Sequence, residues 1–283
     1  MPTLTAHVAL VPYATDITLD FLAELAEVSA ALQKQITRDV GPIWDIDATV
    51  DMFTSLESLP LDYWPVIVGN EPIPDQALGI HLDEFNQPFA LVARRPGWSI
   101  TASHETIEML VDPYGNRFVA GQSPDPEQGR VLFLVEACDP CEAADYAYTI
   151  NNNILVSDFY TPHYFDPVAA SGVRYDYQGQ IEAPRTVLPG GYLSWRNPVD
   201  GRYYQLRDID GNSQIVVLEE MARRGSIREA IDHTPGTPRT IYGGIPERTE
   251  PLVTVRTRAA GMRRLTESWA ASLRGQIESY RRS

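Results

Sequence analysis

One histidine and two glutamates stand close together in residues 103–113, which read SHETIEMLVDP. On an α-helix that turns about 100° per residue, His104 and Glu108 lie one turn apart and about 40° around the axis. Their side chains can therefore converge on one ion. Glu105 points about 100° away from His104, beside such an ion, where a carboxylate can take up a proton. The spacing predicts a metal site with Glu105 as its general base.

The pattern differs by one residue from H-E-x-x-H, the sequence with which many zinc peptidases bind their metal on a helix. Glu108 replaces the second histidine, so an anionic ligand stands in place of a neutral one. A less positive centre makes metal-bound water a weaker acid, and oxygen-rich ligation favours manganese, iron or calcium, although zinc also accepts carboxylates. We expect a divalent metal whose catalytic chemistry is harder than in sites with three neutral ligands.

A third protein ligand must come from outside this helix, because three ligands stacked along one helix cannot surround an ion. The candidates are Glu136, Asp139 and Glu142, about thirty residues downstream. Glu136 is preferred, since it follows directly on the apolar run 131–135 and so has a rigid base, whereas Asp139 and Glu142 lie in the turn after it. The expected roles of the neighbouring residues are to support the ligands or to stabilise a developing oxyanion. These residues are Asp112, Asp139, Glu142 and Tyr146, with Tyr148 and Tyr160 as further donors.

Two other histidines and one cysteine pair bear on the site. His81 lies on a strand expected to border a cleft, or is an ordinary surface residue of that strand. His163 is an alternative ligand that would replace the missing histidine. Cys138 and Cys141 form a lone C-x-x-C, which excludes a four-thiolate zinc site. We expect the pair to have a local structural role rather than a redox role.

Five apolar segments and one long periodic segment must position these residues. A helix is predicted from Asp16 or Thr18 to Gly41-Pro42, with Phe21, Leu25, Val28, Leu32 and Ile36 on one face. The metal-site helix is predicted to begin at a Thr101 cap and to end at Pro113. The predicted strands are 7–12, 48–53, 64–68, 77–82 and 89–93.

The order of these elements and the S-H-E-x-x-E-M-L-x-D-P motif resemble an uncharacterised bacterial family of zincin-like proteins. Residues 31–44, 77–81, 103–113 and 136–142 carry the resemblance, which covers about the first 165 residues. The resemblance implies an α+β, zincin-like metallopeptidase fold. In such a fold a mixed sheet is backed by a long helix and a short helix binds the metal. It also implies zinc as the first choice of metal.

The remainder of the chain is expected to add strands, loops and a helical tail. We predict a zincin-like domain over residues 1–220, rich in strands and loops from about residue 156, and a C-terminal helical extension over 221–283. Apolar residues recur at helical spacing in that extension, at Met262, Leu265, Trp269, Leu273, Ile277 and Tyr280. Such a helix either packs on its own domain or docks to an assembly or to another copy of the chain.

Composition limits the classes of function. A formal net charge of −15 and a pI near 4.7 argue against a nucleic-acid partner, which would need a dense basic surface. No apolar run approaches the roughly 20 residues that span a bilayer, and the amino terminus lacks the pattern of a secretory signal. We expect a cytoplasmic protein without a membrane partner.

Two functions fit these observations. The first is a metal-dependent hydrolase, a zincin-type peptidase of narrow specificity that acts on a peptide or protein through metal-bound water and Glu105. The alternative is a non-catalytic zincin-like binding or structural protein that retains the metal and docks to an assembly through its C-terminal tail.

Overall fold

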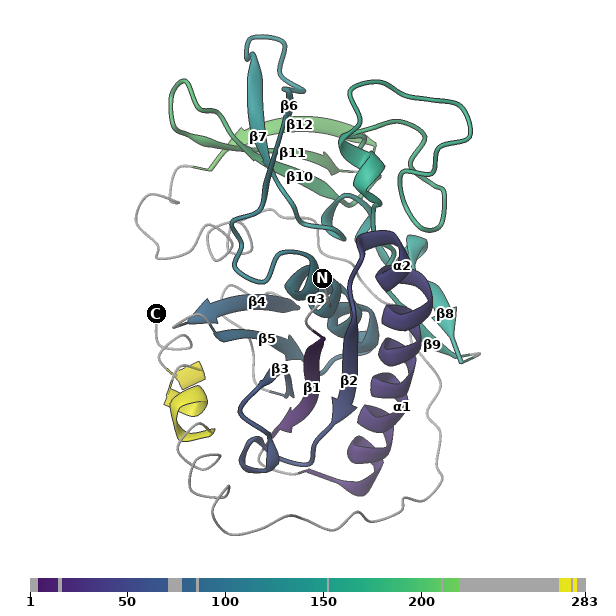
Figure 1. Cartoon of the computed structure of the whole chain (residues 1–283), viewed down its shortest axis with the longest axis vertical. Coiled ribbons are helices and arrows are strands. Elements are labelled where there is room, and N and C mark those ends of the chain that lie inside the picture. Colours follow the sequence, from purple (N-terminus) through teal and green to yellow (C-terminus); the bar gives the residue numbers. More distant parts are fainter. Residues whose placement is uncertain are drawn as a thin grey trace.

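The first of two five-stranded sheets consists of the apolar strands expected from the sequence. A computed structural model of the chain describes residues 5–14, 17–70, 78–84, 87–151, 153–209, 211–218, 270–275 and 277–278. It shows an α+β protein with a mixed five-stranded sheet, a long helix and a second, antiparallel sheet (Figure 1). The coarse fold class predicted from the sequence is therefore confirmed.

The mixed sheet has the strand order β2-β1-β3-β5-β4. Its strands are β1 (Ala6–Tyr13), β2 (Ala48–Met52), β3 (Tyr63–Gly69), β4 (Gly79–Glu84) and β5 (Gln87–Ala93). The first four in spatial order are parallel, and β4 pairs antiparallel with β5 at the edge. The central strands are continuous apolar runs because both faces of this sheet are covered. All five predicted strands are present, with bounds shifted by at most two residues.

The long helix covers one face of this sheet. Helix α1 (Leu19–Gln35) begins at Thr18, whose hydroxyl accepts a hydrogen bond from the Phe21 amide. The five apolar residues predicted to form its buried face are all buried. The expected stop at Gly41-Pro42 is wrong, because the chain continues as a π-helical turn, Ile36–Val40, and as α2, Gly41–Trp44. Pro42 lies in the first turn of α2. Backbone amides there have no partner within the helix, so the N–H that proline lacks is not needed.

The second important helix, α3 (Trp98–Val111), carries the predicted metal motif. It starts three residues before the expected Thr101 cap, since Gly97 adopts a left-handed conformation (φ 83°) and begins the helix. The indole N–H of Trp98 donates a hydrogen bond to Glu24 of α1, which fixes this early start. The helix ends at Val111, with Asp112 as its C-cap, as expected from Pro113.

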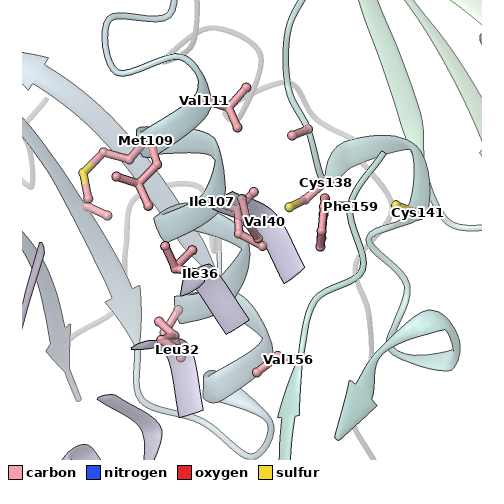
Figure 2. Close-up of a cluster of buried hydrophobic side chains, with 14 of the residues drawn as sticks. Leu32, Ile36, Val40, Ile107, Met109, Val111, Cys138, Cys141, Val156 and Phe159 are labelled. Atoms are coloured by element: carbon pink, nitrogen blue, oxygen red, sulfur yellow. The ribbon is translucent and has the colours of Figure 1, made fainter. Parts of the chain in front are cut away.

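A buried polar network fixes α3 relative to α1. The Ser103 hydroxyl donates to Gln35 Oε1 at 2.7 Å and accepts from the Ser157 amide at 3.0 Å. Around this network Leu32, Ile36 and Val40 belong to the same apolar core as Ile107, Met109 and Val111 (Figure 2). The core therefore sets the rotation of α3 about its axis, and hence the direction of its polar residues.

The second sheet is antiparallel and lies on the other side of α3 from the first sheet (Figure 1). Its order is β12-β11-β10-β7-β6, with bounds Asn212–Val217, Tyr203–Ile209, Tyr192–Arg196, Arg130–Leu134 and Phe118–Gln122. A hairpin, β8 (Tyr148–Ile150) and β9 (Ile154–Val156), packs beside α1 and α3. Short 3₁₀ turns occupy Leu56–Ser58, Asp139–Cys141, Ala144–Tyr146 and Pro162–Phe165.

Helical residues within 270–275 and 277–278 lie on the far face of the first sheet. Helical residues Ala270, Leu273 and Ile277 are buried among side chains of β1, β3, β4 and β5. Arg274 also pairs with Glu57. Two residues of the predicted apolar stripe therefore pack on their own domain. Its other members, Met262, Leu265, Trp269 and Tyr280, lie outside the described residues. No helix in the described part of the chain is both long and apolar enough to cross a membrane.

Candidate functional site

Helix α3 brings His104 and Glu108 together, and a turn from downstream completes the group. The Nε2 atom of His104 lies 3.3 Å from Glu108 Oε2 and 3.3 Å from Asp139 Oδ1. One ligand atom from each of these three residues lies within 4.8 Å of the other two. Glu108 and Asp139 are buried, whereas the His104 side chain keeps 13% of its surface exposed.

These distances fit a bound cation. Two ligand atoms that are each about 2.1 Å from one ion, at the tetrahedral angle, are about 3.4 Å apart. The two His104 distances agree with this spacing to within about 0.1 Å. Imidazole nitrogen and carboxylate oxygen suit zinc, manganese and iron. The three residues could therefore hold a divalent ion. Its fourth coordination position would remain open to a small molecule.

The turn that carries Asp139 is fixed by close backbone contacts. A β-carbon on Gly191, just before β10, would lie 2.6 Å from the Pro140 carbonyl oxygen and 2.7 Å from that of Asp139. Only glycine allows this approach, and the Leu188 amide adds a hydrogen bond to the Pro140 carbonyl. On the other side, the Cys138 amide donates to Glu108 Oε1 at 3.0 Å. Glu108 Oε2 is therefore directed at the histidines.

A second group borders the first and shares Glu108. His81, at the centre of the edge strand β4, is 1% exposed and places Nδ1 3.3 Å from Glu105 Oε2 and 3.8 Å from Glu108 Oε2. Strand β4 approaches α3 closely because Gly79 has no side chain. A β-carbon there would lie 2.5 Å from Thr101 Cγ2 and would overlap the Glu105 carboxylate. The general base expected from the sequence is thus enclosed between α3 and β4.

The electrostatic environment of His104 is dominated by its neighbours. Burial alone would lower the pKa of its imidazole, but the negative charge of Glu108 and the hydrogen bond to Asp139 hold that pKa well above its usual value. The site therefore favours a positive charge at this position. A proton and a metal cation both meet that preference, and they compete for the same nitrogen.

A tyrosine hydroxyl lies near the carboxylates. Tyr160 is fully buried, and its hydroxyl makes no hydrogen bond with any residue that the structure describes. Burial, followed by the charges of Glu136, Glu108 and Asp139, raises its pKa well above the usual value, so the hydroxyl keeps its proton. The Tyr160 amide donates to the Ala137 carbonyl at 2.7 Å, which holds the ring against the segment that carries Glu136. Tyr160 is thus a hydrogen-bond donor at the edge of the site.

The remaining sequence candidates occupy different places. Glu136 is buried close to Tyr160 but belongs to neither ligand group found among the described residues. Asp112 accepts hydrogen bonds from the Asn116 and Arg117 amides and so stabilises the turn after α3.

Three further candidates lie on the downstream turns. Glu142 directly follows the 3₁₀ turn that carries Asp139. Tyr146 is half-buried, and burial together with the charges of Asp145 and Asp208 raises the pKa of its hydroxyl. His163 is exposed and pairs with Asp166, so it is not part of either ligand group.

Two features of the site were less clear in the sequence. His81 was either a residue bordering a cleft or an ordinary surface residue of its strand, and no spacing rule links it to Glu105 and Glu108, which lie more than twenty positions later. Its signal was a histidine inside an otherwise apolar strand. Asp139 stood within an acidic cluster in which Glu136 was preferred, and only the turn geometry separates the two.

The C-x-x-C pair is buried next to the site. Cys138 and Cys141 are free thiols with at most 1% exposure, and burial raises the pKa of both well above the usual value (Figure 2). A protonated, inaccessible thiol is a poor nucleophile. These features support the structural role that we expected for the pair.

Fold and site together define an α+β protein with a buried histidine–carboxylate centre between its two five-stranded sheets. No family model, no curated protein and no solved structure matches this chain.

Proposed function

We propose that this protein is a metal-dependent peptidase with a zincin-like fold and narrow substrate specificity. The observation that carries the proposal is the placement of His104 Nε2 at 3.3 Å from both Glu108 Oε2 and Asp139 Oδ1, which is the spacing of ligands on one tetrahedral ion. His104, Glu108 and Asp139 would hold the cation, with zinc as the first choice. Asp139 takes the place for which the sequence favoured Glu136.

The chain's own residues then have distinct roles. When bound, the cation supplies Lewis-acid activation of a water molecule and of a substrate carbonyl. Glu105 accepts the proton of the attacking water and passes it to the leaving amine. His81, with its Nδ1 3.3 Å from Glu105 Oε2, holds that carboxylate in place. Tyr160 donates a hydrogen bond to the oxygen that becomes negative as the carbonyl is attacked.

Glu105→Gln tests the enzyme. Protein freed of metal by a chelator and reloaded with Zn²⁺ is incubated with a proteome-derived peptide library, and new peptide ends are identified by mass spectrometry. We expect wild-type protein to cut a small set of sequences. Glu105→Gln should lose this cleavage while the ion held by His104 stays bound, because a neutral amide cannot accept the proton. Glu127→Gln, which changes an exposed glutamate, is the matched control and should cleave as the wild type does.

A second candidate function rests on the burial of the site. Closed metal sites are typical of structural metals, and His104 is the one member of the two ligand groups that is not buried. The same experiment separates the two functions. A wild-type protein that binds Zn²⁺ tightly but produces no new peptide ends would refute the peptidase and support a non-catalytic protein with a retained metal. A protein that binds no metal would refute both.

A further inference from the structure

We infer that the site binds a second divalent cation, held by His81, Glu105 and Glu108, next to the first. This inference rests on the proposed function in one respect, namely that His104, Glu108 and Asp139 hold the first cation. The two ligand groups share Glu108 and no other residue. Each contains one imidazole and two carboxylates, so the second group is as well suited to a divalent ion as the first.

The distances support a real ligand set. His81 Nδ1 is 3.3 Å from Glu105 Oε2, close to the spacing of about 3.4 Å for two ligands at the tetrahedral angle. Its distance to Glu108 Oε2 is longer, at 3.8 Å, which corresponds to a wider angle at the ion. The second cation should therefore bind more weakly than the first. All three side chains are buried, so the packing around them restricts their positions.

Glu108 is oriented to serve both positions. Its Oε1 atom accepts the Cys138 amide, and its Oε2 atom faces His104 on one side and His81 on the other. A single carboxylate oxygen can bridge two cations, and enzymes with two-metal sites hold their ions about 3.5–4 Å apart. The backbone hydrogen bond fixes which oxygen is shared, as neighbouring groups commonly do for metal ligands.

The second cation would control the first site. Glu105 Oε2 cannot accept a proton while it is bound to a cation. Occupancy of the second position and proton transfer by Glu105 therefore exclude each other. Because the second position is weaker, the protein should hold one ion at low metal concentration and two at high concentration. Rising metal concentration would thus switch off the chemistry that the first ion allows.

The test is the number of ions bound to the purified full chain, which does not depend on any substrate. Chelator-treated protein is dialysed against increasing Zn²⁺, and in a parallel series against Mn²⁺, which avoids the thiols of Cys138 and Cys141. Bound metal is measured by mass spectrometry. We expect wild-type protein to bind two ions in two separate steps. His81→Asn and Glu105→Gln should bind one ion, Asp139→Asn should lose the tighter one, and Glu108→Gln should lose both.

The control for adventitious binding is His163→Asn, since His163 is exposed and lies beside Asp166. It should still bind two ions. If His163→Asn removes one ion, or if His81→Asn leaves the count unchanged, the inferred second site is wrong. A wild-type count of one, unchanged in His81→Asn, overturns the second site but leaves the proposed function standing. A count of zero overturns both. Circular dichroism of each variant verifies that the fold is intact.

Discussion

Two buried aspartates should make the stability of this protein fall as pH rises. Asp158 and Asp176 are both fully buried and their carboxyl groups face each other. Asp158 Oδ1 accepts hydrogen bonds from the Phe159 and Gln178 amides, at 2.8 and 3.2 Å. Burial, then the hydrogen bond to Asp176 and its charge, raises the pKa of Asp158 to about 9. In the folded protein Asp158 therefore keeps its proton at neutral pH.

The sign and size follow from linkage between protonation and folding. The unfolded chain releases this proton near pH 3.8, its ordinary value, whereas the folded chain keeps it up to about pH 9. The stabilisation from the proton is complete below the unfolded pKa and is lost as pH rises toward the folded pKa. Within that window the free energy of unfolding should fall by up to about 1.4 kcal/mol for each pH unit.

Asp158→Asn should remove this dependence. An asparagine carbonyl can accept the same two amides, and its NH₂ group can donate to Asp176 as the protonated acid does. Urea unfolding, followed by tryptophan fluorescence at pH 5, 6, 7 and 8, gives the free energy of unfolding for wild type and variant. The difference between them should change with pH by up to about 1.4 kcal/mol per unit, in favour of the variant at high pH.

The exposed carboxylate Asp145 provides the control. Asp145→Asn should have a free energy of unfolding that parallels the wild type across the same pH range. If Asp158→Asn also runs parallel to the wild type, the two buried carboxyl groups do not share a proton, and the reasoning fails.

Two further predictions concern packing. Gly79→Ala should cost about 1–3 kcal/mol of stability and should weaken metal binding that depends on Glu105, because the new methyl group overlaps that carboxylate. Gly129→Ala, with open space around its β-carbon, should change neither property. If the two variants lose equal amounts of stability in urea unfolding and equal affinity in metal titration, the close contact between Gly79 and Glu105 is contradicted. Leu273→Ala should lower the free energy of unfolding by about 2–5 kcal/mol, since Leu273 is buried on the first sheet. Ser272→Ala on the exposed side is its control, and an equal loss in both variants would refute that packing.

Local patterns in the sequence predicted much of the fold. The spacing of apolar residues in α1 and the apolar runs of β1 to β5 are properties of a single segment, so each could be recognised by itself. The bounds of α1 and α3 were less predictable. Gly41-Pro42 continues a helix because Pro42 falls in the first turn of α2, and Trp98 starts α3 early because Glu24 of another helix accepts its indole hydrogen. Each of these helix boundaries depends on where the residue falls in a helical turn or on a contact with another helix, which the local sequence does not show.

The residues of the site also fall into two groups, those that the sequence pairs and those that only the tertiary structure brings together. The pairing of His104 with Glu108 was determined by the sequence alone, because one helical turn fixes the distance between residues four positions apart. Only the tertiary structure decided which acid joins them and that His81 lies beside Glu105. Asp139 reaches His104 because a tight turn packs on Gly191, and His81 reaches Glu105 because the edge strand β4 approaches α3 closely at Gly79. Such contacts depend on strand order and turn conformation, which local periodicity does not encode.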